Sequence, residues 1–250
     1  MIALALAVSI AALIGVAFAA DRLLSLSGSR DAHEALVIFL CRRYSRWLHR
    51  LRVSGTEHIP RRRDAGAPPL IIVANHTAGV DPVLVQAACP FLVSWVMAED
   101  MALPELRTMW DIGDVITVNR ERADGLSARE VIRRLRAGRA IGVFPEGFIE
   151  RPPRVILPFQ PGVGLFAART GAVILPIVID GAPQVEPAWA SLWRPSRSML
   201  KILPPRRYAK GAPAREIADD LRRVFLEETG WRAAERPVPP PAPRTRGASA

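Results

Sequence analysis

Three uninterrupted apolar runs place the strongest constraint on the fold of this chain. They are Leu70–Ala74, Ala140–Phe144 and Ala172–Ile179. Each has about the length of one β-strand, and none shows the apolar–polar alternation of a strand that has one face in water. Strands buried on both faces are typical of parallel sheets with helices on either side. The runs therefore predict the centre of such a sheet.

Helix signals lie between these runs. Asp81-Pro82 puts a proline at a favoured first helical position, and Ser127–Glu130 forms a capping box before a helix that ends at Gly138. The same alternation continues in further segments, namely strands over 115–118 and 199–203 and helices over 163–170 and 214–229. The pattern predicts an α/β fold, with a layered mixed or largely parallel sheet and flanking helices.

The N-terminal segment Met1–Ala20 is apolar except for Ser9 and Gly15. As a helix it would be about 30 Å long, which matches the hydrocarbon core of a bilayer. It predicts a transmembrane or membrane-embedded helix, which either spans the bilayer or lies within one leaflet. A cleaved signal peptide and a buried core helix are the alternatives, the first because Ala17-Phe18-Ala19 resembles a cleavage site.

The formal net charge of +10 is unevenly distributed along the chain. Residues 21–63 carry ten basic and four acidic side chains, residues 64–229 twenty and nineteen, and residues 230–250 four and one. Because the excess flanks a nearly neutral centre, the charge does not favour nucleic-acid binding. Basic residues that follow an apolar anchor instead predict a cytoplasmic location for the remainder of the chain, by the positive-inside rule.

These patterns predict four regions. They are a membrane helix over 1–20, a basic amphipathic juxtamembrane segment over 21–52, a globular domain over 53–229 and a disordered Pro/Arg-rich tail over 230–250. The alternative for the second region is an ordinary surface helix packed on the domain.

The first candidate for a functional site is the segment Asn75–Pro82, directly after a buried strand. Ligand sites of α/β sheets lie at the carboxyl ends of their strands. Asp81 could accept the proton on one nitrogen of His76, which would leave the other nitrogen free as a general base. The alternatives are that Asp81 caps the next helix and that His76 is an ordinary loop residue.

Two more segments carry candidate residues. Phe144–Gly147 places Glu146 and Gly147 on a turn after another buried strand, where a carboxylate can bind hydroxyl groups. Gly113–Arg120 ends in Arg120, which is suited to an anionic group. A simple turn and a surface ion pair are the alternatives for these two segments.

In this order the segments resemble the glycerolipid acyltransferase family, which includes 1-acyl-glycerol-3-phosphate acyltransferases. Four blocks match over about residues 53–205, namely His76–Asp81 preceded by Asn75, Gly113–Arg120, Phe144–Gly147 and Leu175–Ile177. The resemblance implies an α/β acyltransferase domain. It also implies that no metal or other cofactor takes part, and that acyl-CoA or acyl-carrier protein is the acyl donor.

The resemblance further implies roles for individual residues. His76, held by Asp81, would remove a proton from the acceptor hydroxyl, which then attacks the thioester carbonyl. Glu146 and Gly147 would contact the acceptor, and Asn75 and Arg120 would complete the substrate-binding residues. The implied reaction is acylation of a lysophospholipid-type acceptor such as 1-acyl-glycerol-3-phosphate, in phospholipid biosynthesis.

The chain departs from the family pattern after Gly147. Phe148-Ile149-Glu150 stands where the family usually has Thr-Arg-Ser, so an arginine that would help to hold a phosphate is replaced by Ile149. Arg151 or Arg154 could take its place. The alternative acceptor is a non-phosphate lysolipid such as lyso-ornithine lipid. A thioesterase and a non-catalytic basic membrane-binding module are the alternatives from other classes.

The predicted partners are therefore a lipid bilayer, a lysolipid acceptor and the acyl donor, without nucleic acid. The predicted location is the inner, cytoplasmic membrane of a bacterium, with the catalytic domain on its cytoplasmic face.

Overall fold

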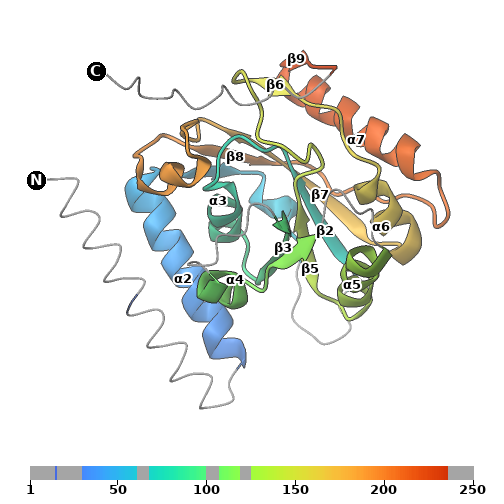
Figure 1. Cartoon of the computed structure of the whole chain (residues 1–250), viewed down its shortest axis with the longest axis horizontal. Coiled ribbons are helices and arrows are strands. Elements are labelled where there is room, and N and C mark those ends of the chain that lie inside the picture. Colours follow the sequence, from blue (N-terminus) through green and yellow to red (C-terminus); the bar gives the residue numbers. More distant parts are fainter. Residues whose placement is uncertain (1–14, 16–29, 61–67, 100–106, 119–124, 236–250) are drawn as a thin grey trace, which may run out of the picture.

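The computed structural model describes residue 15 and residues 30–60, 68–99, 107–118, 125–235. Figure 1 shows a central sheet with helices on both sides. The helices are α2 (Arg30–Leu48), α3 (Asp81–Ala88), α4 (Arg107–Ile112), α5 (Gly125–Arg136), α6 (Gly162–Thr170) and α7 (Ala214–Thr229), with 3₁₀ turns η1 (Thr56–His58) and η4 (Ala188–Trp193). The strands are β1 (Arg52–Ser54), β2 (Leu70–Ala74), β3 (Val93–Ala98), β4 (Ile116–Val118), β5 (Ala140–Val143), β6 (Val155–Ile156), β7 (Val173–Asp180), β8 (Met199–Ile202) and β9 (Arg232–Ala233).

The main sheet has seven strands in the order β1-β8-β7-β2-β5-β3-β4. Among the pairs of neighbouring strands in this sheet, β7–β8 is antiparallel and the other described pairs are parallel. The predicted α/β fold with a mostly parallel mixed sheet is therefore confirmed. The three apolar runs become β2, β5 and β7, which lie side by side with β2 between the other two.

Strand β2 shows why both faces of the sheet need a cover. Ile71 and Val73 pack in a core beneath α5, α6 and α7, while the alternate residues Leu70 and Ile72 pack toward α3 on the opposite face. All five residues of β2 are buried. Because successive side chains of a strand point to opposite faces, an apolar run of this length fills two cores at once.

One side of helix α2, in the segment predicted to be juxtamembrane, packs on the domain. Ile38 and Leu48 are buried, and the Nε of Arg42 donates to the carbonyl of Ala87 at the end of α3, at 3.1 Å. The hydroxyl of Tyr44 donates to the carbonyl of Leu192 in η4. The structured domain therefore begins before residue 53, where the predicted boundary lies.

The predicted membrane helix over 1–20 lies outside the described residues, except for Gly15. Among the residues that the structure does describe, no helix combines the length and the apolar character needed to cross a bilayer.

The described fold also extends past the boundary predicted at residue 229. Helix α7 ends at Gly230, which has a positive φ of 64°. Strand β9 then pairs with β6, with Arg232 opposite Val155, so residues up to Glu235 belong to the domain. The remainder of the predicted tail lies outside the described residues.

Candidate active site

His76 and Asp81 meet where β2 ends and α3 begins. The Nδ1 of His76 lies 2.9 Å from the Oδ2 of Asp81. Asp81 is fully buried, whereas 18% of the His76 side chain is exposed. Because a carboxylate can only accept, Nδ1 is the donor in this bond, and Nε2 carries the lone pair of the ring.

The carboxylate of Asp81 is surrounded by donors from the same loop. Oδ2 accepts the N–H groups of Thr77 at 2.6 Å and Ala78 at 2.8 Å, and Oδ1 accepts the Thr77 hydroxyl at 3.0 Å. These groups precede α3, and the N-cap residue Val80 has no side-chain capping bond. Asp81 therefore organises the His76 loop, and the geometry does not favour the alternative in which it only caps the helix.

Two stacked aromatic rings, those of Phe144 and Trp95, support the imidazole of His76. The ring of His76 lies against that of Phe144, with centroids 4.1 Å apart and planes at 11°. Trp95 of β3 covers the other side of Phe144, at 4.6 Å and 13°. Gly142 makes room for the indole, because a Cβ at this position would lie 2.7 Å from the Trp95 ring. Trp95 and Gly142 lie outside the four blocks, so no sequence motif predicted their part in the site.

The side chain of Glu146 contacts the main chain of His76. Its Oε1 accepts the N–H of His76 at 2.9 Å, its Oε2 accepts the N–H of Leu157 at 2.8 Å, and only 1% of the residue is exposed. Burial raises the pKa of Glu146 to about 8, although the two N–H donors act in the opposite direction. Gly147 follows with a positive φ of 72°, which completes the turn.

Asn75 joins two strands at the same edge of the sheet. Its Nδ2 donates to the carbonyl of Ile179 at 3.0 Å, and its Oδ1 accepts the N–H of Ile179 at 2.8 Å. The residue is fully buried. Both ends of the amide are therefore bonded to β7, next to the loop on which His76 lies.

The two arginines predicted as substitute phosphate ligands both have carboxylate partners. Arg151 pairs with Glu186 at 2.7 Å and Arg154 with Asp180 at 3.1 Å. Beside them the buried Glu150 accepts bonds from Gln184 and from the N–H of Arg154. Burial raises the pKa of Glu150 to about 8. The predicted anion ligand Arg120 lies outside the described residues.

Within the described part of the chain, no group of three or more His, Cys, Asp or Glu side chains is arranged to hold a metal ion. In the described site, His76 is bonded to the buried Asp81 and its ring is stacked on Phe144.

The chain is similar to known acyltransferases. The model of the acyltransferase family matches residues 50–180, more than half of the chain, and this range contains all four blocks. The chain is 33% identical over 147 residues to a 1-acyl-sn-glycerol-3-phosphate acyltransferase of Borreliella burgdorferi. That match covers 56% of this chain and 55% of the relative, so it spans only about half the length of either protein.

The fold is also similar to that of a solved structure. The crystal structure of the 1-acyl-sn-glycerophosphate acyltransferase PlsC from Thermotoga maritima matches with a TM-score of 0.65 and 24% sequence identity. The match covers 87% of this chain and 91% of that one. The predicted resemblance is confirmed, and the chain belongs to the acyltransferase family.

Proposed function

We propose that this protein transfers a fatty acyl group from acyl-CoA or acyl-carrier protein to the hydroxyl group of a lysophospholipid-type acceptor. One observation carries the proposal, which is the 2.9 Å bond between the Nδ1 of His76 and the buried Asp81. It leaves Nε2 of a partly exposed imidazole as a base at the carboxyl edge of the sheet.

The proposed chemistry needs no covalent acyl-enzyme. Nε2 of His76 removes the proton of the acceptor hydroxyl while the hydroxyl oxygen attacks the carbonyl carbon of the thioester. The tetrahedral intermediate then expels the thiolate, which takes the proton back from the imidazolium as the C–S bond breaks. General-base catalysis contributes about 10²–10⁴-fold, and Asp81 stabilises the positive charge that His76 carries between the two proton transfers.

Two acceptors are compatible with this chemistry. The first is 1-acyl-glycerol-3-phosphate, the molecule named for the relative from Borreliella burgdorferi. The second is a lysolipid without a phosphate, such as lyso-ornithine lipid. The ion pairs of Arg151 with Glu186 and of Arg154 with Asp180 support the second acceptor, because each guanidinium already has a carboxylate that would compete with a phosphate.

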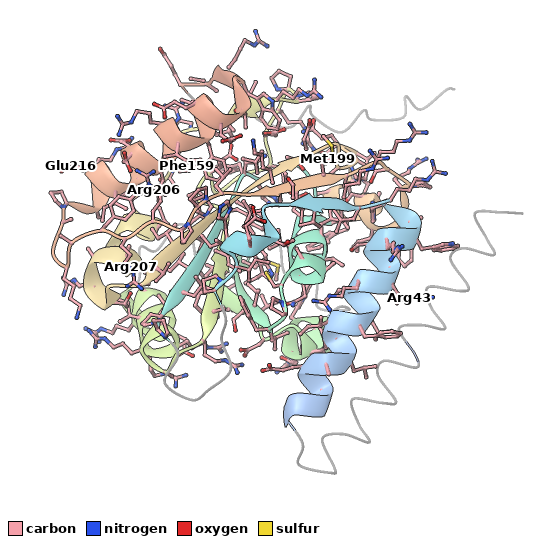
Figure 2. The ribbon with its side chains drawn as sticks, turned by 180° about the vertical axis from the view of Figure 1, so that it is seen from behind. Arg43, Phe159, Met199, Arg206, Arg207 and Glu216 are labelled. Atoms are coloured by element: carbon pink, nitrogen blue, oxygen red, sulfur yellow. The ribbon has the colours of Figure 1, made fainter. Side chains whose placement is uncertain are left out.

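The proposed location is the cytoplasmic face of the inner membrane. Helix α2 exposes Phe39 and Trp47, at 57% and 60%, among basic side chains. Arg43 points away from the domain on this helix (Figure 2). Exposed aromatic and basic side chains on one helix suit an anionic lipid surface.

The proposal is tested with purified full-length protein, acyl-CoA and acyl-carrier protein as donors, and each acceptor in vesicles. We expect the rate of acyl transfer to fall about 100-fold or more in His76→Ala. The control is His58→Ala, which should keep the wild-type rate, because His58 lies in η1 and is bonded to the carbonyl of Ile202. A His76→Ala variant with wild-type transfer would exclude the mechanism. Thiol release without acylated product would identify a thioesterase.

The acceptor is tested at position 149. Ile149→Arg is expected to raise the rate with lysophosphatidate about tenfold relative to Ile149→Leu, since a hydrogen bond to a charged group contributes about 1.5–3 kcal/mol. If wild type already acylates lysophosphatidate faster than lyso-ornithine lipid, and Ile149→Arg does not raise that rate further, then 1-acyl-glycerol-3-phosphate is the acceptor.

A further inference from the structure

The segment that follows β5 holds the main chain of His76 from both sides. The carboxylate of Glu146 accepts the N–H of His76 at 2.9 Å, and the N–H of Glu150 donates to the carbonyl of His76 at 2.7 Å. Phe144, at the start of the same segment, stacks on the imidazole. The position of the ring therefore depends on this segment as well as on Asp81.

The second oxygen of Glu146 is also occupied. It accepts the N–H of Leu157 at 2.8 Å, and Leu157 is fully buried directly after β6. The carboxylate thus connects the end of β2 to the segment after β6. With only 1% of Glu146 exposed, neither oxygen is accessible to an acceptor hydroxyl in this structure.

We propose that Glu146 is a positioning residue that fixes the main chain of His76, and that it does not bind the acceptor. The inference rests on the proposed function, because it takes His76 as the base. It changes the role that the family resemblance implied for Glu146, which was direct contact with the acceptor.

The two oxygens of a carboxyl group explain why a glutamate suits this place. Each accepts an N–H group from a separate segment, and both can do so whether or not the carboxyl group carries a proton. A glutamine would turn one acceptor into an NH₂ group that faces an N–H donor. One of the two bonds is then lost, and either His76 or Leu157 moves. Misplacement of a catalytic group by about 1 Å can reduce the rate about 100-fold.

The test separates kcat from the KM for the acceptor. We expect Glu146→Gln to lower kcat about 10–100-fold and to change the acceptor KM by about twofold or less. Glu130→Gln, a carboxyl that pairs with Arg133 and Arg134 on α5, is the matched control and keeps both constants. If Glu146→Gln does not fold, the same two constants are measured for Glu146→Asp, whose shorter side chain can keep one of the two bonds.

The possible outcomes decide separately on this inference and on the proposed function. An acceptor KM that rises tenfold or more overturns the positioning role, whatever happens to kcat, and so does a variant with both constants unchanged. Wild-type protein that transfers no acyl group, or His76→Ala that transfers at the wild-type rate, removes the proposed function itself.

Discussion

The Oδ2 of Asp81 lies 2.9 Å from the Nδ1 of His76 and accepts the N–H groups of Thr77 and Ala78 at the same time. One oxygen thus fixes both the imidazole and the backbone of the loop that carries it. Because Asp81 is fully buried, no water competes for these bonds. The orientation of His76 is therefore established before a substrate arrives.

Asp81→Asn should separate the charge of this residue from its shape. The carbonyl oxygen of asparagine can take the place of Oδ2, and its NH₂ group can donate to the Thr77 hydroxyl that now donates to Oδ1. The loop is retained, but the negative charge that stabilises the imidazolium is lost. We expect acyl transfer to fall about 100-fold or more, measured as kcat/KM.

Asp81→Ala provides the comparison, because it removes the hydrogen bonds as well as the charge. Its unfolding free energy should fall by about 1–3 kcal/mol, the cost of leaving buried donors without a partner. If Asp81→Asn transfers acyl groups at the wild-type rate, the charge of Asp81 has no part in the reaction.

The centre of the sheet could be predicted from the sequence because its signal is local. Leu70–Ala74 is β2 with the predicted bounds, and the other two apolar runs differ from β5 and β7 by one residue at the ends. Strand β3 was not predicted. Ser94 interrupts its apolar pattern, and the hydroxyl of Ser94 donates to Asp114, twenty residues further along the chain, at 2.6 Å. Tertiary contacts of this kind leave no periodicity in the sequence.

The residues of the site also differ in how far they could be predicted from local sequence. His76 and Asp81 are five residues apart, so one loop brings them together, and their spacing directly after a buried strand suggested the pair. Trp95, on strand β3, contacts the ring of Phe144, which in turn stacks on His76. Glu146 accepts the N–H of Leu157, which directly follows β6. The roles of Trp95 and Glu146 therefore became apparent only once the strands were placed side by side.

Gly142→Ala should disturb the aromatic stack without touching a catalytic group. The new Cβ would lie 2.7 Å from the indole of Trp95, so the ring or the strand has to move. Overpacking of this kind costs about 1–3 kcal/mol, which we expect as a lower unfolding free energy together with slower acyl transfer. Gly162→Ala is the control, because no atom lies within 4 Å of its added Cβ. Equal stability of the two variants would contradict the tight contact.

Glu150 gives a prediction for the pH dependence of stability. Burial raises its pKa from 4.5 to about 8, so between these pH values the unfolded chain releases a proton that the folded protein retains. Wild-type stability therefore falls as the pH rises through this range. Glutamine does not titrate, so Glu150→Gln does not lose stability in this way. Its Tm at pH 8 should therefore exceed that of wild type, by about 2–4 °C for each kcal/mol of difference in unfolding free energy.

At pH values well below 4.5 the advantage of Glu150→Gln should disappear, because the carboxyl of the wild type is then largely protonated in both the folded and the unfolded state. Thermal unfolding of the two proteins across this range measures the difference. A Tm difference that stays constant with pH would show that Glu150 is not held in its neutral form.

Trp47 tests the proposed contact of α2 with a lipid surface. The side chain is 60% exposed in the protein alone, and in contact with a bilayer its indole would lie at the level of the headgroups. Vesicles with brominated acyl chains should therefore quench a smaller share of the fluorescence in Trp47→Phe than in wild type. Trp231→Phe is the control, because Trp231 packs beside α7 on the opposite side of the sheet, and its replacement should leave the lipid-quenched component in place. Quenching that is equally strong in Trp47→Phe and wild type would mean that α2 does not face the membrane.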